Sequence, residues 1–240
     1  MSAERTRAGA AVTVQPRDGA APGVAAARGR VGGVVAEVVR QAVRDAGATG
    51  VVLIDDGSPE ASLAREWCAD AVGADAVIAV PPPSPAAVDA CCDALGAGLD
   101  GGVAAEEVHR LHARLIAAAR DALVAHPANK TALLLASRTP PEPLLPLGDL
   151  YAGQVAALTG AWTAPPDVLR LVDGAGGIAA VDAALYAWLE ERRPLDVALA
   201  SLGRAASGVH RAIDAGRFAR RRVGLVPKLG GRTLGIDLLG

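Results

Sequence analysis

The chain has 240 residues, a formal net charge of -2 at pH 7 and 51% hydrophobic residues. This length is enough for one domain with a sizeable core. The charge gives no electrostatic basis for binding nucleic acid or an anionic membrane surface, so neither partner is expected. Aromatic residues are only 2% of the chain, so alanine, valine and leucine must fill the core. No stretch reaches the roughly 18 apolar residues that a membrane-spanning helix needs.

The N-terminal segment and the cysteines bear on where the protein works. Residues 1–29 are rich in alanine, glycine and arginine, and we expect them to be a disordered tail before a single domain over 30–240. A transit peptide is the alternative, although Glu4 and Asp18 interrupt its basic character. No apolar signal-peptide region is visible. Three cysteines without a C-x-x-C pair favour a reduced, cytoplasmic protein.

A buried strand that leads into a helix is predicted near residue 50. Residues 51–54 are four consecutive apolar residues, three of them β-branched, which is typical of a strand covered on both faces. Pro59 suits the first position of the helix that follows, because an N–H group at that position would have no partner within the helix and its absence costs nothing. This helix is predicted to continue to Val72.

The loop between this strand and helix combines two opposing electrostatic features. Its free backbone N–H groups and the helix dipole favour an anion such as phosphate. Asp55, Asp56 and Glu60 lie on the same loop. An unpaired carboxylate about 5 Å from a phosphate charge opposes it by roughly 3 kcal/mol at an effective dielectric constant near 20. A bridging metal ion would reverse that sign. Solvated loop acids, or acids that interact with the helix N-terminus, are the alternatives.

Strands and helices alternate along the first part of the chain. Short links between them indicate an α/β fold with a parallel, doubly wound sheet over residues 30–160. The predicted strands cover residues 51–54, 76–80 and 131–136, and the predicted helices cover 34–46, 60–72, 85–95, 104–125 and 151–159. Residues 161–240 are predicted to form a helical C-terminal region, with helices over 178–190, 196–202 and 205–215.

A segment after the third predicted strand carries a family resemblance. The residues from Pro146 to Val155 read P-L-G-D-L-Y-A-G-Q-V and resemble the P-L-G-D-L-Y-K-T-Q-V segment of ammonia-dependent NAD synthases. These belong to the ATP pyrophosphatases, of the adenine nucleotide alpha-hydrolase-like type, which carry an S-G-G-x-D-S loop. Weaker matches occur in the family's order, and together they span residues 31–238. They lie at residues 39–53, 113–114, 181–186, 218–222 and 232–237.

The resemblance implies a reaction, a cofactor and a partner. Such enzymes adenylate the carboxylate of deamido-NAD with ATP and Mg²⁺, release pyrophosphate and let ammonia displace AMP. The protein must supply backbone N–H groups, cations and metal-binding acids to the phosphates. The family forms homodimers through long helices, and residues 104–125 look like such a helix. Its apolar stripe, with Val108, Leu111 and Leu115, is expected to face inward.

The chain departs from the family where ATP would bind. In place of S-G-G-x-D-S, residues 56–61 read D-G-S-P-E-A, which keeps the glycine and offers Glu60 for the metal-binding aspartate. In place of T-G-N-K-S-E, residues 137–142 read S-R-T-P-P-E, which keeps only the glutamate. By resemblance the nucleotide-binding positions are Asp56, Gly57, Ser58, Glu60, Ala61, Arg114, Glu142 and Asp149, with Glu60 also the metal ligand.

Several of these residues have a simpler interpretation. Asp149 is equally consistent with a turn residue, and Arg114 with a surface residue of its helix. Glu106, His109 and His112 lie near one another on that helix, but no ligand from another segment completes a metal site. Two functions therefore remain open. One is an NAD synthase-like ligase of weak or lost activity; the other is a non-catalytic dimer, a pseudoenzyme that acts as a binding or regulatory partner.

Overall fold

Three parallel strands form the sheet of this protein. The structure, a computed structural model, describes residues 22–95, 101–136, 142–217 and 224–229. Strand β1 (Gly50–Ile54) is central, with β2 (Val77–Val80) on one side and β3 (Ala122–Ala125) on the other. Both neighbours run parallel to β1. The parallel sheet predicted from the sequence is confirmed.

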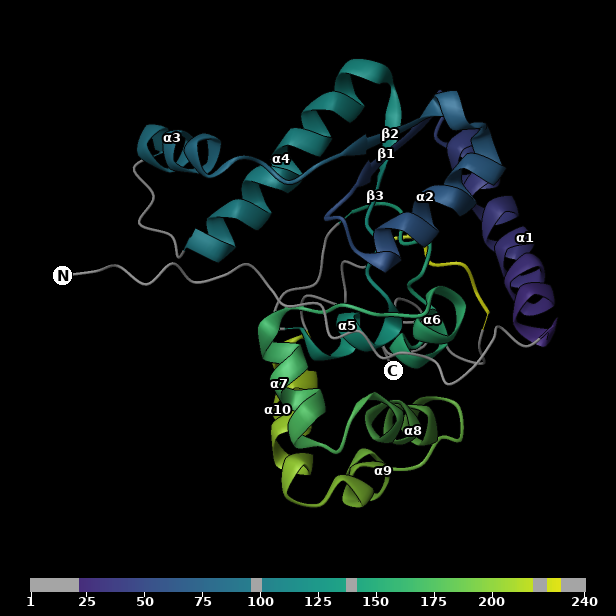
Figure 1. The fold of residues 1–240 in the computed structure, drawn as a ribbon, viewed down its shortest axis with the longest axis vertical. Coiled ribbons are helices and arrows are strands. Elements are labelled where there is room, and N and C mark those ends of the chain that lie inside the picture. Colours follow the sequence, from purple (N-terminus) through teal and green to yellow (C-terminus); the bar gives the residue numbers. More distant parts are fainter. Residues whose placement is uncertain (1–21, 96–100, 137–141, 218–223, 230–240) are drawn as a thin grey trace.

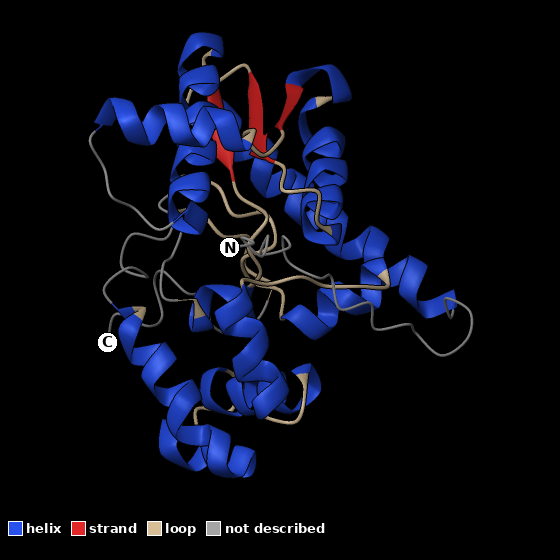
Figure 2. Cartoon of the chain, turned by 60° about the vertical axis from the view of Figure 1, so that its left-hand side comes forward, coloured by secondary structure: helices blue, strands red, loops and turns tan. Residues whose placement is uncertain are grey.

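Helices cover both faces of the sheet, as Figures 1 and 2 show. On one face, α1 (Pro22–Asp45) and α2 (Pro59–Val72) pack on alternate residues of β1, and on the other face α4 (Gly101–Arg120) packs on the residues between them. Because the side chains of a strand alternate, β1 is buried on both sides and every one of its residues is buried. This layering confirms the doubly wound α/β fold. Helix α3 (Pro85–Leu95) lies beside α4.

The third predicted strand is wrong. Residues 131–136 lie in helix α5 (Lys130–Leu135), which begins where the Asn129 side chain accepts a hydrogen bond from the Ala132 N–H at 2.9 Å. Three consecutive leucines of this helix are at most 1% exposed, and an apolar run buried on all sides shows no period that separates helix from strand. The true strand, β3, lies in the segment expected to finish the helix over 104–125. That helix ends at Arg120, and Asp121 takes a positive φ of 49°.

The second half of the chain is helical and has a core of its own. After α6 (Ala152–Thr159) come α7 (Pro166–Gly174), α8 (Ile178–Leu189), α9 (Leu195–Leu199), the 3-10 helix η2 (Ala200–Ala205) and α10 (Ala206–Ala215). The other 3-10 helix, η1 (Ala74–Ala76), lies before β2. Leu185, Leu189 and Val209 are fully buried in the second half with the leucines of α5. The helical C-terminal region is confirmed over the described residues, although α7 was not predicted.

The predicted N-terminal tail needs one correction. Helix α1 begins at Pro22, so the expected tail over 1–29 is wrong for its last residues, whose alanine-rich composition suits a helix. Residues 1–21, 218–222 and 232–237, which carried part of the expectations, lie outside the described residues. Leu225 bridges to Leu144 as an isolated extended pair. No helix in the described part of the chain is long and apolar enough to cross a membrane.

Candidate functional site

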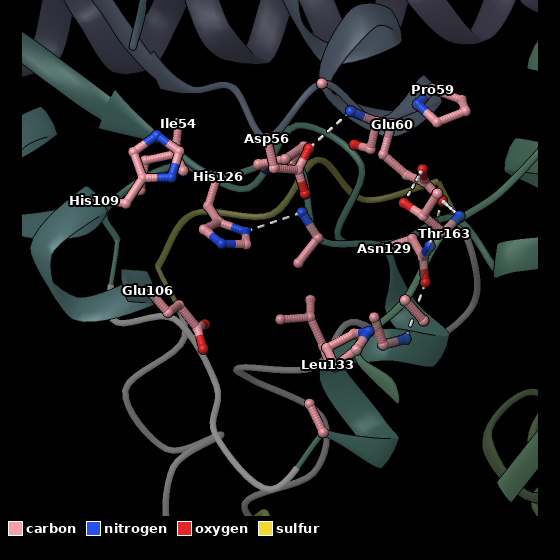
Figure 3. Close-up of a pocket in the computed structure, with 18 of the residues that line it drawn as sticks. Ile54, Asp56, Pro59, Glu60, Glu106, His109, His126, Asn129, Leu133 and Thr163 are labelled. Carbon is pink, nitrogen blue, oxygen red and sulfur yellow. Dashed lines mark hydrogen bonds between the residues drawn. The ribbon is translucent and has the colours of Figure 1, made fainter. Parts of the chain in front are cut away.

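A cavity of about 480 Å³ opens at the carboxyl ends of the strands. Its wall combines the loop after β1, residues 126–129 after β3, parts of α4 and α5, and residues 163–165 before α7 (Figure 3). Ligands of open α/β sheets bind at this edge, because each strand ends there in a loop that can present polar groups. The volume is in the range of small-molecule sites, roughly 300–1,000 Å³.

The loop after β1 uses its own carboxylates to satisfy its backbone N–H groups. The Gly57 N–H donates to Asp55 Oδ1 at 3.0 Å, and the Ser58 N–H donates to Asp56 Oδ1 at 3.0 Å. Gly57 has a φ of 77°, in the left-handed region that favours glycine, and this conformation turns the chain into the helix. The two aspartates therefore occupy the donors that would otherwise face an anion.

The first turn of α2 is closed in the same way. The Ala61 N–H donates to Ser58 Oγ at 3.0 Å and the Ser62 N–H donates to the Ser58 carbonyl at 3.1 Å. Pro59 occupies the first helical position, as predicted, and has no N–H. The backbone N–H of Glu60 interacts with its own carboxylate. The N–H groups of residues 57, 58, 61 and 62 are thus used within the segment.

Glu60 connects α2 to the segment before α7. Its side chain is buried and accepts hydrogen bonds from the Thr163 N–H at 2.9 Å and the Thr163 hydroxyl at 3.0 Å. A weaker contact of 3.5 Å comes from the Asn129 amide. Burial raises the pKa of Glu60 above its usual value of 4.5, although the Thr163 hydrogen bonds oppose the rise. Both of its oxygens are already hydrogen-bonded, and its assignment as a metal ligand stays a prediction.

A pyrophosphate group with Mg²⁺ does not fit this arrangement. In the loop that would hold it, the N–H groups of Gly57, Ser58 and Ala61 are already hydrogen-bonded to the side chains of Asp55, Asp56 and Ser58. Across the described ranges, no three His, Cys, Asp or Glu side chains gather as ligands for a metal ion. An incoming phosphate would have to displace two carboxylates that carry the same sign of charge.

His126 presents a hydrogen-bond donor to the cavity. Its Nδ1 accepts from the Ala128 N–H at 3.1 Å, so a neutral ring carries its proton on Nε2. In Figure 3, the rest of the ring points into the open space between Glu106 and Leu133. Burial lowers the pKa of His126 to about 3, and nearby Arg110 and His109 add to the effect. The imidazole is therefore neutral at physiological pH.

Helix α4 forms a second polar wall. His109 Nε2 lies 2.6 Å from the Val80 carbonyl, to which it donates at the end of β2. Arg110 is buried and pairs with Glu106 and, at 3.4 Å, with Glu107, while its Nε has no hydrogen-bond partner. His112, which the sequence placed with these residues, is exposed. The polar groups of α4 thus serve the cavity wall and do not form a metal site.

Four of the predicted site residues lie away from the cavity wall, namely Ala61, Arg114, Glu142 and Asp149. Arg114 and the fully buried Glu142 form an ion pair at 3.1 Å, so the structure brings these two together. Burial raises the pKa of Glu142, and Arg110 and Arg114 oppose that shift. Asp149 is buried against Lys130 at 2.9 Å and accepts from the Leu229 N–H at 2.6 Å. Their roles as nucleotide-binding residues stay predictions.

The loop residues Asp56, Gly57, Ser58 and Glu60 line the cavity, whereas Ala61 lies behind it as a fully buried residue of α2. The sequence analysis missed the polar residues that follow β3, chiefly His126 and Asn129, and it missed Thr163. The signal was available for the first two: had β3 been recognised, the residues directly after it would have been candidates, because parallel strands end at one edge. Thr163 has no such signal.

The fold and the cavity define an α/β protein with a cavity at the carboxyl edge of its sheet. A solved structure, NH3-dependent NAD synthetase from Campylobacter jejuni subsp. jejuni NCTC 11168 in complex with the nitrate ion, is similar over 80% of this chain and 95% of that chain, with a TM-score of 0.61 and 18% identity. The chain therefore has the fold of an NH3-dependent NAD synthetase, as the resemblance implied.

A second solved structure also matches, with a lower TM-score. Glutamine-dependent NAD+ synthetase from Acinetobacter baumannii, in complex with adenosine diphosphate, matches over 88% of this chain with 20% identity and a TM-score of 0.45. The match covers 48% of that protein, so this chain spans about half its length. No protein-family model and no curated protein matches the sequence.

Proposed function

We propose that this protein is a non-catalytic member of the NAD synthetase fold, a pseudoenzyme that binds a small molecule and forms little or no NAD. One observation carries the proposal. The N–H groups that would hold the pyrophosphate of ATP are hydrogen-bonded to Asp55 and Asp56 at 3.0 Å each. Catalysis of adenylation requires donors and cations that are free for the charge developing on the leaving pyrophosphate.

The size of the expected loss follows from the contacts that are missing. The chain has Asp56 in place of the motif's serine and Ser58 in place of its second glycine, and it lacks a lysine in residues 137–142 and at Ala152. Each lost charged hydrogen bond is worth roughly 1.5–3 kcal/mol, and about 1.4 kcal/mol changes a rate tenfold. Such effects need not add, yet the two lost lysine contacts together correspond to about 3–6 kcal/mol, or a rate reduced by roughly 10²–10⁴-fold.

The test is pyrophosphate release from MgATP with deamido-NAD and ammonium. The Campylobacter jejuni NH3-dependent NAD synthetase, assayed under the same conditions, serves as the positive control. We expect this protein to release pyrophosphate at the background rate. Robust turnover, with AMP and NAD formed in equal amounts, would show that the carboxylates of the loop act through a metal ion and that the proposal is wrong.

A variant loop separates binding from turnover. Replacing residues 56, 58, 60 and 61 together as Asp56→Ser, Ser58→Gly, Glu60→Asp and Ala61→Ser is expected to improve MgATP binding. It should not restore full turnover, because the sequence of residues 137–142 is unchanged. Asp70→Ser, which removes an exposed carboxylate near the other end of α2, is the matched control and should leave MgATP binding unaffected.

We also propose a homodimer that uses α4. The inward orientation expected for its leucines is wrong: Leu111 is 48% exposed and Leu115 is 61% exposed, because the smaller Ala113 and Ala117 pack on the sheet. A second copy would cover this stripe. Light scattering at micromolar concentration should give a dimer mass, and Leu111→Glu with Leu115→Glu should give a monomer. Val197→Glu, at a 54% exposed residue on α9, is the control.

The cysteines support a reduced, cytoplasmic setting as part of this proposal. All three are free thiols in the structure. Cys68 is buried, and burial raises its pKa to about 12, so it stays a protonated and unreactive core residue. Neither Cys91 nor Cys92 is fully exposed.

A further inference from the structure

The polar groups of the cavity are arranged for a ligand without phosphate. We propose that the cavity binds an uncharged ligand of the nucleoside type: a partly apolar ring system with hydrogen-bond acceptors on one edge and N–H or O–H donors elsewhere. This inference deepens the proposed function and rests on it, because it concerns the same cavity and the same loop after β1. It adds the chemical class of the ligand. We call residues 55–58 the closed loop, because the N–H groups of Gly57 and Ser58 are hydrogen-bonded to Asp55 and Asp56.

One donor of fixed orientation, that of His126, faces the cavity. His126 holds its Nε2–H toward the open space, since Nδ1 is fixed by the Ala128 N–H at 3.1 Å. Arg110 lines the same cavity, its side chain is only 5% exposed, and its Nε–H has no hydrogen-bond partner. A carbonyl or ring-nitrogen acceptor of a ligand would accept from the His126 Nε2–H, whereas the Arg110 Nε–H is enclosed by protein and contributes charge rather than a donor to the cavity.

Carboxylate oxygens lie elsewhere on the wall. Asp56 uses Oδ1 to accept from Ser58, and its exposed side chain lines the cavity. Glu106 pairs with Arg110 through Oε1 and faces the cavity from the side opposite Leu133 (Figure 3). Both carboxylates retain acceptor capacity for an amino or hydroxyl group of a ligand. They would repel a phosphate in the same place.

The balance of charge decides against an anion. Among the described residues of the wall, the carboxylates are those of Asp56, Glu60 and Glu106, and the guanidinium is that of Arg110. The two histidines of the wall are each fixed by a backbone group, one as an acceptor and one as a donor. A phosphate charge within about 8 Å of one unpaired carboxylate loses more than about tenfold in affinity at an effective dielectric constant near 20.

Aliphatic side chains supply the remaining surface. Ile54 closes the cavity at the end of β1, Leu133 faces it from α5, and Pro165 and Leu169 border it from the start of α7. Polar groups at the edges of an apolar slot fix the orientation of a ligand, while the flat aliphatic surface accepts the faces of a ring system. The described wall therefore combines the features that an unphosphorylated nucleoside requires.

The test is a charge series measured by isothermal titration calorimetry on the full chain. Adenosine, AMP and ATP, each with and without Mg²⁺, differ mainly in the number of phosphates. We expect adenosine to bind with a Kd below about 1 mM, AMP to bind at least about tenfold more weakly, and ATP more weakly still. Mg²⁺ should not reverse this order.

Three variants tie the result to the residues. Asp56→Asn keeps the acceptor for the Ser58 N–H and removes the charge. The ratio of the Kd for AMP to the Kd for adenosine should therefore fall by about tenfold. His126→Phe should weaken adenosine binding about tenfold, whereas His126→Gln, which keeps a donor in a similar place, should retain most of it. His210→Phe, on α10 and outside the cavity, is the control. Circular dichroism verifies that each variant is folded.

Failure of this inference differs from failure of the proposed function. Tighter binding of AMP or ATP than of adenosine, or no binding of adenosine at about 1 mM, would overturn the inference even if no pyrophosphate is released. Equal adenosine affinities for His126→Phe and His126→Gln would also overturn it. Turnover of MgATP to NAD would instead overturn the proposed function, whatever the affinity for adenosine.

Discussion

Lys130→Met should be the most damaging single substitution at the junction of the α/β part and the helical part. Lys130 is fully buried, and its ammonium group pairs with Asp149 at 2.9 Å and with Glu190 at 2.8 Å. It also lies 5.0 Å from the ring centre of Tyr151. The two carboxylates are 0% and 8% exposed. Methionine fills a similar volume but removes the ammonium group that the two carboxylates share.

Removing one member of a buried ion pair costs about 3–5 kcal/mol, because the remaining charge is left uncompensated. This is a large part of the roughly 5–15 kcal/mol that stabilises a typical domain. Urea unfolding followed by circular dichroism measures the loss. Arg28→Met is the matched control: its partner Glu66 is exposed, so the cost should be within about 1 kcal/mol. Equal losses of unfolding free energy in Lys130→Met and Arg28→Met would refute the reasoning.

Two further predictions concern pH. Burial raises the pKa of Glu60, so the ionised form opposes folding; stability should fall as pH rises above about 4.5 through the raised pKa, and Glu60→Gln, which can still accept from Thr163, should remove that dependence. A steeper dependence in the variant would contradict this. Burial lowers the pKa of His126 to about 3, so stability is fully present above about 6.5 and is lost toward pH 3, by up to about 1.4 kcal/mol per pH unit. Its ring resonances in NMR spectra should not titrate between about pH 8 and 5; a midpoint near 6.5 would contradict the burial.

Local sequence signals predicted the first strand and the helix after it. Residues 51–54 form a strand because they are apolar and mostly β-branched, and α2 begins at Pro59 because proline suits that position and Ser58 caps the turn. These features depend on neighbours in the chain. The position of the cavity could also be predicted from the sequence, because the loop that ends this strand lies at the carboxyl edge of the sheet.

Tertiary contacts decided what the sequence could not. The leucines of α5 are buried on all sides, which removes the period that would distinguish helix from strand. The inward and outward faces of α4 were exchanged because alanines, and not leucines, pack against β1 and β3. Lys130 was not assigned a role because its partners Asp149 and Glu190 are distant in the chain.

The closed loop was not predicted either. The sequence showed that carboxylates and free N–H groups share one segment, and it left open whether a metal ion, solvent or the helix would compensate the carboxylates. In the structure the acids compensate the N–H groups of the two residues that follow them. An aspartate can accept a hydrogen bond from the backbone two residues further on, so this local pairing provides the acceptor that an anion would otherwise supply.

The most direct test of the closed loop is the response of its amides to pyrophosphate. In ¹H–¹⁵N NMR spectra, the Gly57, Ser58 and Ala61 resonances report the three donors that Asp55, Asp56 and Ser58 occupy. Titration with pyrophosphate and Mg²⁺ to about 1 mM, a concentration that detects even weak sites, should leave these resonances unchanged. Saturable shifts of all three amides would show that the loop opens to an anion, and the account of a closed loop would then be wrong.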